Sequence, residues 1–378
     1  MRYRREIYDR FSTVVESALF AVEGGEVEEQ NIMIHSTNHL APFDEQLAGV
    51  VGCFEELCNG SGCYTPIFVR VFVSDAANQI STVEKSLKCD CPISIIEQPP
   101  LDGSKIAVWC YLQSGVVGSK TYKTSHNGYT HIWSTSVANP CVSGSQMQTE
   151  DLLTSYVEHL RDDDCSLLDN TIRTWFFVQN VDVNYGGVVV GRNNVFDREG
   201  LVVDSHFIAS TGIGGRVGDH RITTIMDAYS VKGISAEQMQ YLYGSTHLNS
   251  TAEYGVRFER GTAVHYGDRS HIFISGTASI NNRGEVVHVG DIRKQTLRMW
   301  ENVEVLLREA ESSFEDVAQI IVYLRDISDY VVARGLFDER FANIPTVFVY
   351  APVCRPTWLI EMECLAIRQN RDERFRKF

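Results

Sequence analysis

Apolar and polar positions follow the same order in three stretches of the chain. In the C-terminal stretch, an apolar run at residues 271–279 predicts a strand, and residues 295–310 place apolar side chains at helical intervals. A β-branched run at 320–324 predicts another strand, a second helix is expected over 331–341, and residues 358–365 form a closing strand. With a hairpin at its start, each stretch is expected to form a β-β-α-β-α-β unit, an α+β sheet with helices on one face.

The N-terminal and C-terminal stretches also share landmarks. Gln46 and Asp75 are 29 positions apart, and Gln295 and Asp326 are 31 positions apart. A proline follows 17 positions after Asp75 and 19 positions after Asp326. The middle stretch keeps the order of elements but is expected to lack the glutamine and the proline. Such self-similarity indicates a repeated unit. We expect units at residues 1–117, 118–236 and 250–367, linkers at 114–120 and 231–236, and a basic tail at 368–378.

Composition limits the classes of function. Hydrophobic residues make up 44% and charged residues 22% of the 378 residues, which is typical of a globular protein with a large core. No apolar run reaches the roughly 18–20 residues that span a bilayer, and no secretory signal follows Met1. The net charge of −15 argues against a nucleic-acid partner, and the basic tail is expected to be solvated. The ten cysteines lack metal-binding spacing, so we expect a cytoplasmic protein with reduced thiols and no metal or cofactor.

The C-terminal stretch contains a set of landmark residues in a characteristic order: Gly284, Asp291, Gln295, Asn302, Asp316, Asp326, Pro345 and Glu361. In these residues it resembles the Rid family (YjgF/UK114). The resemblance is weaker over residues 30–111 and weakest over 120–230. The resemblance implies the α+β unit described above, assembled as trimers with active sites at subunit interfaces. A chain with three such units is therefore expected to be a monomeric pseudo-trimer with sites between its units, and further association into homo-oligomers stays open.

Other segments are similar to chorismatases, the chorismate-hydrolysing branch of the same fold. They are residues 99–105, 173–175, 209–214 and 273–280, together with Tyr185 and Arg192. The resemblance implies that the chain hydrolyses the enolpyruvyl ether of chorismate, a small anionic substrate. The products would be pyruvate and either a dihydroxycyclohexadiene carboxylate or a hydroxybenzoate.

This hydrolysis needs a general acid beside a carbon atom, with a pKa raised towards neutrality. Glu361 is the candidate, because its strand neighbours are apolar and desolvation favours a protonated carboxyl. Glu363 lies two positions on and should face the same side of the strand, where its charge would raise the pKa of Glu361 further. The residues alone leave open that both are solvated charges on an exposed strand, and the resemblance favours Glu361 as the acid.

The two carboxylates of the substrate need bidentate donors, for which arginine is better suited than lysine. Arg355, six positions before Glu361, and Arg192 from the middle unit are the candidates. Tyr185 is a candidate to hydrogen-bond a carboxylate or the ring hydroxyl. Without the resemblance, Arg192 could equally be a surface helix residue and Tyr185 a packing aromatic.

Three further residues are expected at the same cleft. The backbone of Gly276 and Thr277 has little side-chain bulk and would allow close approach of the substrate. Cys354, beside Arg355, is placed at the rim as a second catalytic candidate. Within chorismatases, variation near this position accompanies different products, and a cysteine implies hydroxybenzoate formation. A buried structural thiol is the alternative.

Two other classes of function stay open. The first is a Rid-type enamine or imine deaminase. Members of that class carry an arginine directly after the proline matching Pro345, whereas this chain has Thr346 there and Ile93 in the N-terminal unit. The second is a non-catalytic protein that binds a small metabolite between its units.

Overall fold

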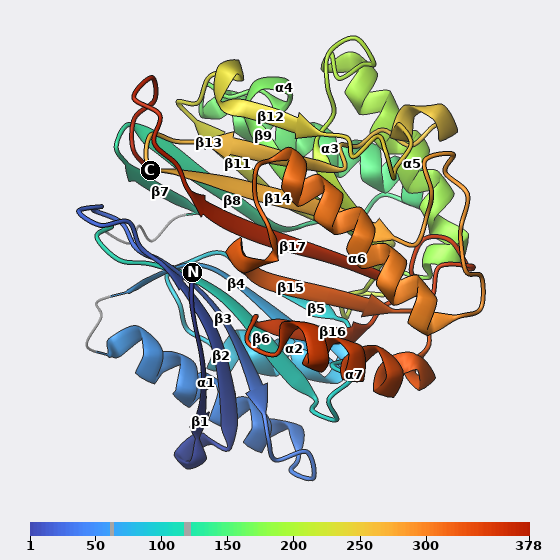
Figure 1. Ribbon diagram of the computed structural model, residues 1–378. Coiled ribbons are helices and arrows are strands. Elements are labelled where there is room, and N and C mark those ends of the chain that lie inside the picture. Colours follow the sequence, from blue (N-terminus) through green and yellow to red (C-terminus); the bar gives the residue numbers. More distant parts are fainter. Residues whose placement is uncertain (61–63, 117–121) are drawn as a thin grey trace.

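The computed structural model describes residues 1–60, 64–116 and 122–378, and it contains three β-sheets with α-helices on their outer sides (Figure 1). The first sheet has the order β1-β2-β3-β6-β4-β5. The elements of the first unit are β1 (Arg2–Tyr8), β2 (Thr13–Phe20), β3 (Glu29–Ser36), α1 (Phe43–Asn59), β4 (Thr65–Val73), α2 (Ala76–Ser86), β5 (Ile93–Glu97) and β6 (Ile106–Gln113).

The second and third sheets repeat this plan, with the orders β10-β9-β11-β8-β7 and β12-β13-β14-β17-β15-β16. The second unit contains β7 (Lys123–His126), β8 (Tyr129–Val137), α3 (Ser145–Asp162), α4 (Leu167–Asn170), β9 (Thr171–Val178), α5 (Val181–Arg198), β10 (Ala209–Gly214) and β11 (Thr224–Lys232). The third contains β12 (Met239–Leu242), β13 (Gly261–His265), β14 (Arg269–Ala278), α6 (Ile292–Glu309), β15 (Val317–Leu324), α7 (Tyr330–Phe341), β16 (Thr346–Tyr350) and β17 (Ile360–Gln369).

The predicted fold class is confirmed, with two strands more than expected in the first and third units and one more in the second. In every unit, one of the extra strands follows the second helix and pairs in parallel with the strand before that helix, as β16 does with β15. A five-residue apolar run such as Thr346–Tyr350 is too short to be told from a loop by periodicity, so only the pairing identifies it as a strand. Residues 117–120 of the predicted first linker lie outside the described residues.

The sheet registers align the three units residue by residue. Strands β4, β9 and β15 end at Val73, Val178 and Leu324. In the pairing with the parallel edge strands, these three residues lie opposite Glu97, Gly214 and Tyr350, respectively. One residue earlier in each strand, the partners on the closing strands β6, β11 and β17 are Ala107, Ile225 and Glu361. Glu361 is therefore the acidic member of a set of three equivalent positions, of which the other two are apolar.

The middle unit has the glutamine landmark that it was expected to lack. In the outer units, Gln46 accepts a hydrogen bond from the Lys105 amide and Gln295 accepts one from the Leu359 amide, at the start of the closing strand. Gln148 on α3 makes the same connection to the Thr223 amide. The side chain of a buried glutamine thus joins the first helix to the closing strand in all three units. The expected absence was wrong. Gln148 is followed by Thr149 as Gln295 is followed by Thr296, but this two-residue match is too short to identify the position from the sequence.

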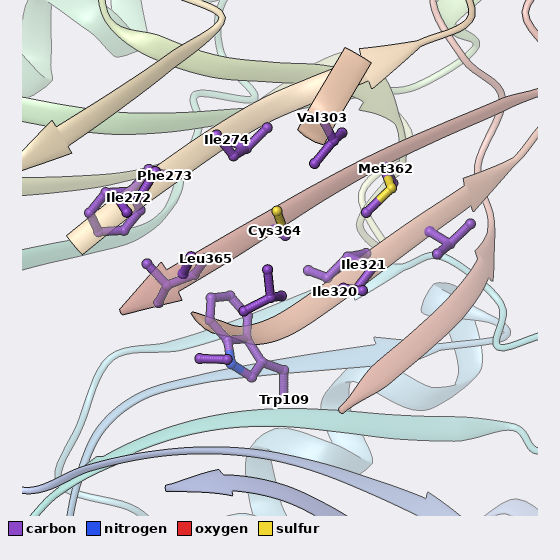
Figure 2. Close-up of a cluster of buried hydrophobic side chains, with 14 of the residues drawn as sticks. Trp109, Ile272, Phe273, Ile274, Val303, Ile320, Ile321, Met362, Cys364 and Leu365 are labelled. Atoms are coloured by element: carbon purple, nitrogen blue, oxygen red, sulfur yellow. The ribbon is translucent and has the colours of Figure 1, made fainter. Parts of the chain in front are cut away.

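The inner faces of the three sheets meet at the centre of the molecule. At equivalent positions, Arg70 of the first unit pairs with Asp227 of the second at 2.8 Å, and Trp175 of the second donates to Glu363 of the third at 2.7 Å. At the third equivalent contact, Trp109 of the first unit belongs to the same buried cluster as Ile321 of the third (Figure 2). At these three equivalent positions, the units are thus joined by an ion pair, by a hydrogen bond to a carboxylate and by apolar packing.

The basic tail differs from the expectation of a solvated end. Phe378 is only 1% exposed and packs its ring against His126 and His271. The guanidinium of Arg376 lies 4.7 Å from the ring centre of Tyr129. Aromatic burial and cation–π contact therefore hold this segment against the second and third units. Among the residues that the structure describes, none of the helices could serve as a membrane span.

Candidate active site

A narrow cavity of about 40 Å³ lies between the second and third units. The second unit contributes side chains from α5 and β10, and the third contributes the ends of β14 and β17 with the loop before β17. The lining residues are Tyr185, Arg192, Ser210, Gly212, Val256, Phe258, Arg260, Gly276, Ala278, Ile280, Cys354, Arg355, Trp358 and Glu361. The structure thus brings Glu361, Arg192, Arg355, Tyr185, Gly276 and Cys354 to one place, although they come from two units.

Glu361 lines this cavity and is buried, with 4% of its surface exposed. Its carboxylate lies directly over the backbone of Gly276, where an added Cβ would stand 2.1 Å from Oε1. Only glycine leaves space for the carboxyl at this position. Burial raises the pKa of Glu361 to about 8, and the charge of Glu363 adds to this effect, while Arg173 and Arg260 oppose it. Glu361 is therefore a protonated, neutral acid at pH 7.

Glu363 faces the same side of β17 as Glu361, as the alternation of strand side chains predicts, but its environment is different. Arg173 of β9 lies 2.7 Å from its Oε2, and the indole of Trp175 donates to its Oε1 at 2.7 Å. Thr211 of β10 donates to the same carboxylate and also accepts from the Gly276 amide. Glu363 is thus the ionised partner of a buried arginine, and neither carboxylate is a solvated charge on an exposed strand.

Three arginines surround the neutral acid. Arg192 on α5 is buried, with its guanidinium 5.9 Å from the ring centre of Phe176. Arg355 lies over Trp358, 4.9 Å from the ring centre. Arg260 donates to the carbonyl and to the side-chain oxygen of Asn249. Because Glu361 is neutral, the cavity has a net positive charge in a chain whose overall charge is −15. This local field favours an anionic ligand.

Tyr185 and Cys354 line the cavity from opposite units, and both are half-buried. The ring of Tyr185 covers Gly212 of β10, where an added Cβ would come within 2.6 Å of it. Burial raises the pKa of the Cys354 thiol to about 12, and the charge of Glu361 acts in the same direction. Cys354 is therefore a thiol at neutral pH and not a thiolate nucleophile.

Thr277 is not part of this cavity. Because strand side chains alternate, β14 turns Gly276 and Ala278 towards the cavity and Thr277 away from it. The Thr277 hydroxyl donates to the Ser275 carbonyl, and the side chain is buried.

Sequence reasoning missed several lining residues. Arg260 stands directly before β13, a strand that the apolar pattern did not reveal, and Phe258 lies in the irregular segment before it. Ser210 and Gly212 are within the segment 209–214, which the sequence identified without assigning its residues to the site. An arginine followed by a short β-branched run, at residues 260–264, is the signal that could have indicated Arg260.

Comparisons with known proteins agree with this architecture. The family described as endoribonuclease L-PSP matches residues 259–368. A RutC family protein of Pyrococcus abyssi is 37% identical over 101 residues, which are 26% of this chain and 79% of that protein. The 3-aminoacrylate deaminase RutC of Acinetobacter baylyi is 31% identical over 97 residues, covering 25% and 77%. Among solved structures, a chorismatase aligns with a TM-score of 0.63 at 19% identity, over 80% of this chain and 93% of that one.

These matches confirm the expected family and fold. At 19% identity, the likeness to the chorismatase structure establishes the fold alone, and it extends over most of the chain. The likeness to the Pyrococcus protein is closer in sequence and covers most of that protein's length. This chain therefore belongs to the RutC family, within the Rid (YjgF/UK114) proteins, and it has the fold of a chorismatase.

Proposed function

We propose that this protein hydrolyses the enolpyruvyl ether of chorismate, with Glu361 as the general acid. The observation that carries the proposal is a buried carboxyl, neutral at pH 7, enclosed with three arginines in a cleft between two units. Protonation of a carbon atom requires an acid with a pKa near the working pH, and a dianionic substrate requires cations close to that acid. The likeness to the chorismatase fold supports the same reaction.

The arginines hold the substrate in this proposal. Arg192 reaches the cleft from the second unit, whereas Arg260 and Arg355 reach it from the third. Cations on both walls can bind the two carboxylates of chorismate separately and so orient the enol ether towards Glu361. Tyr185 supplies a hydroxyl near the rim for a further hydrogen bond. Glu363 is already neutralised by Arg173 and does not repel the substrate.

The reaction then proceeds in three steps. Glu361 transfers its proton to the terminal methylene carbon of the enol ether, which forms an oxocarbenium ion and leaves Glu361 ionised. Water adds to that cation and loses a proton, which the ionised Glu361 accepts. The resulting hemiketal breaks its bond to the ring oxygen, releasing pyruvate and the ring alcohol. A buried carboxylate favours regaining its proton, so the acid is restored for the next turnover.

Cys354 influences which ring product forms in this proposal. The thiol keeps its proton because its pKa is about 12, so it can contact the ring or donate a weak hydrogen bond but does not attack it. We place it at the ring end of the substrate, where it favours the hydroxybenzoate product, which forms when the diene-diol loses one hydroxyl group and one ring proton as water. Chorismate is larger than the free space of about 40 Å³. Its entry therefore requires side chains that line the cavity to move.

A lactate-dehydrogenase-coupled assay tests the function directly. Purified protein is mixed with chorismate in the presence of a chelator, and NADH consumption reports pyruvate. Release well above the uncatalysed background supports the proposal, and chromatography of the ring product distinguishes the diene-diol from the hydroxybenzoate. If chorismate binds but is recovered unchanged, the protein is a metabolite-binding protein. If it neither binds nor reacts, the proposal is wrong.

The pH dependence of this reaction should follow the protonation of Glu361. The protonated acid is the active form, and its pKa is about 8. We expect kcat/KM for pyruvate release to stay level below that pH and to fall about tenfold per pH unit above it. A profile measured from pH 6 to 10 checks this expectation. An activity that rises through pH 8 would instead indicate a general base.

A Rid-type deaminase is the second candidate, because one matched relative is a 3-aminoacrylate deaminase. The sheet registers put Ile93, Ser210 and Thr346 at equivalent positions, where the deaminases are expected to carry their arginine. The cleft with Glu361 thus has a serine in place of that cation. Ammonia release from an enamine substrate, lost in Arg355→Ala, would favour this alternative.

A further inference from the structure

A second cavity, of about 470 Å³, lies between the first and second units. The first unit contributes α2 and β5, and the second contributes the end of β8, the loop after β10 and the start of β11. The lining residues are Ile80, Val83, Glu84, Leu87, Ile93, Ile95, Ser136, Ala138, Val217, Gly218, Asp219, Ile222 and Ile225. This volume is within the range of small-molecule sites in proteins.

This cavity is the candidate active site repeated one unit earlier in the chain. Helices α2 and α5 each begin three residues after the equivalent strand ends, Val73 and Val178. Counting from those ends, Ile80 corresponds to Tyr185 and Leu87 corresponds to Arg192. The edge-strand registers likewise match Ile93 with Ser210 and Ile95 with Gly212. On the closing strands, Ile225 stands where the third unit has Glu361.

The residue differences between the two clefts all remove polar groups from the second cavity. The hydroxyl of Tyr185, the guanidinium of Arg192 and the carboxyl of Glu361 are each replaced by an aliphatic side chain. The cleft keeps its walls but has lost the groups that would bind or protonate an anion. If the two units simply packed against each other here, these aliphatic side chains would fill the space between them. Instead, they line a cavity.

The charged residues of this second cavity also disfavour an anionic ligand. None of the described lining residues is a lysine, arginine or histidine. The charged members are Glu84, which is exposed, and Asp219, which Arg221 holds in a bidentate ion pair. A carboxylate ligand would therefore meet negative charge without a cation among the lining residues, and it would lose its hydration against aliphatic walls.

We propose that this cavity binds an uncharged, largely apolar small molecule. The walls supply dispersion contacts and burial of apolar surface, and Ser136 supplies a hydroxyl for one polar group of the ligand. The site is separate from the cleft of Glu361, and the proposal does not depend on the reaction catalysed there.

The test uses N-phenyl-1-naphthylamine, an uncharged dye whose fluorescence rises in apolar surroundings, with the full-length protein. We expect saturable binding that is insensitive to salt and is not displaced by chorismate or 4-hydroxybenzoate. Ile80→Trp fills the cavity from α2 and should weaken binding at least tenfold. Val331→Trp makes a similar change at an exposed position of α7, the equivalent helix of the third unit, and should bind like the wild type.

The outcomes decide between this cavity and other apolar sites. Unchanged affinity in Ile80→Trp, displacement of the dye by chorismate, or absence of saturable binding overturns the proposal. Circular dichroism melting shows whether Ile80→Trp folds. If it does not fold, Val217→Phe fills the cavity from the loop after β10 and replaces it in the titration, with the same tenfold loss expected and unchanged affinity counting against the site.

Discussion

Glu361→Gln is expected to lower kcat/KM for pyruvate release from chorismate by roughly 10²–10⁴-fold, the usual contribution of a general acid. Glutamine has the shape of the protonated carboxyl, so it fits over Gly276 and leaves the three arginines in place. It has no proton acidic enough for a carbon atom, so the enol ether should bind and not react. The coupled assay measures the rate, and isothermal titration measures whether chorismate still binds.

The control for this variant is a buried carboxylate outside the cavity. Glu16 on β2 is 7% exposed and accepts a hydrogen bond from the Thr346 amide, so Glu16→Gln should change turnover less than about twofold.

The pH dependence of protein stability provides a second check on Glu361. The folded Glu361 keeps its proton up to about pH 8, whereas the unfolded residue ionises near its ordinary pKa of 4.5. Stability contributed by the neutral carboxyl is therefore complete below pH 4.5 and is lost as the pH rises through 8.

At pH 9, Glu361→Gln should accordingly melt at a higher temperature than the wild type, because it removes a buried charge. A variant that is folded and more stable but catalytically inactive would assign the proton transfer to Glu361. Retained turnover in Glu361→Gln would refute that assignment, and a variant that does not bind chorismate would point to a binding role instead.

Glu363→Ala is expected to destabilise the protein by about 3–5 kcal/mol, because it leaves the Arg173 charge buried without its partner. Both side chains are only 2% exposed, and Arg173 lies 2.7 Å from the carboxylate. The variant also removes the acceptor of the Trp175 indole, which joins the second unit to the third. Denaturant unfolding, followed by tryptophan fluorescence, measures the loss in the free energy of unfolding.

A double variant separates the buried charge from the loss of packing. Arg173→Met with Glu363→Leu replaces the ion pair by apolar side chains and should recover most of the stability lost in Glu363→Ala, since such replacements are often neutral or stabilising. A loss below about 1 kcal/mol in Glu363→Ala would show that water reaches Arg173 and that this contact does not hold the units together. Equal losses in the single and double variants would assign the effect to packing.

Local pattern was sufficient to predict the repeated unit. Strands such as residues 320–324 and the helix that carries Gln295 are encoded by short-range periodicity, which does not depend on the rest of the chain. The edge strand β16 and the strand β13 were not predicted, because short apolar runs become strands only through their partners. Gln148 was missed for a related reason: its equivalence to Gln46 and Gln295 is shown by a hydrogen bond to the closing strand, and a single matching neighbour, Thr149 for Thr296, is too little to reveal it.

The candidate site likewise has a part that the local sequence indicates and a part that it does not. A glutamate among apolar strand neighbours, with a second glutamate two positions on, is a local pattern that placed both carboxyls on one side of the strand. It left open whether they were buried, and the family resemblance was needed to favour Glu361 as the acid. The partners of these two carboxyls come from elsewhere. Arg173 and Trp175 reach Glu363 from another unit, Gly276 makes room for Glu361, and Arg260 joins the cavity from a segment about a hundred positions earlier.

The sequence by itself therefore determined the α+β units and their threefold repetition, because both depend on side chains close together along one strand or helix. Tertiary structure decided which side chains lie around each closing strand: arginines and a tyrosine around Glu361, and aliphatic side chains around Ile225. Ala107, Ile225 and Glu361 occupy the same position in their sheets, and their clefts differ through the edge strand and helix that the neighbouring unit presents. Contacts between residues far apart in the chain have no periodic signature, so only the assembled fold distinguishes a charged cleft from an apolar one.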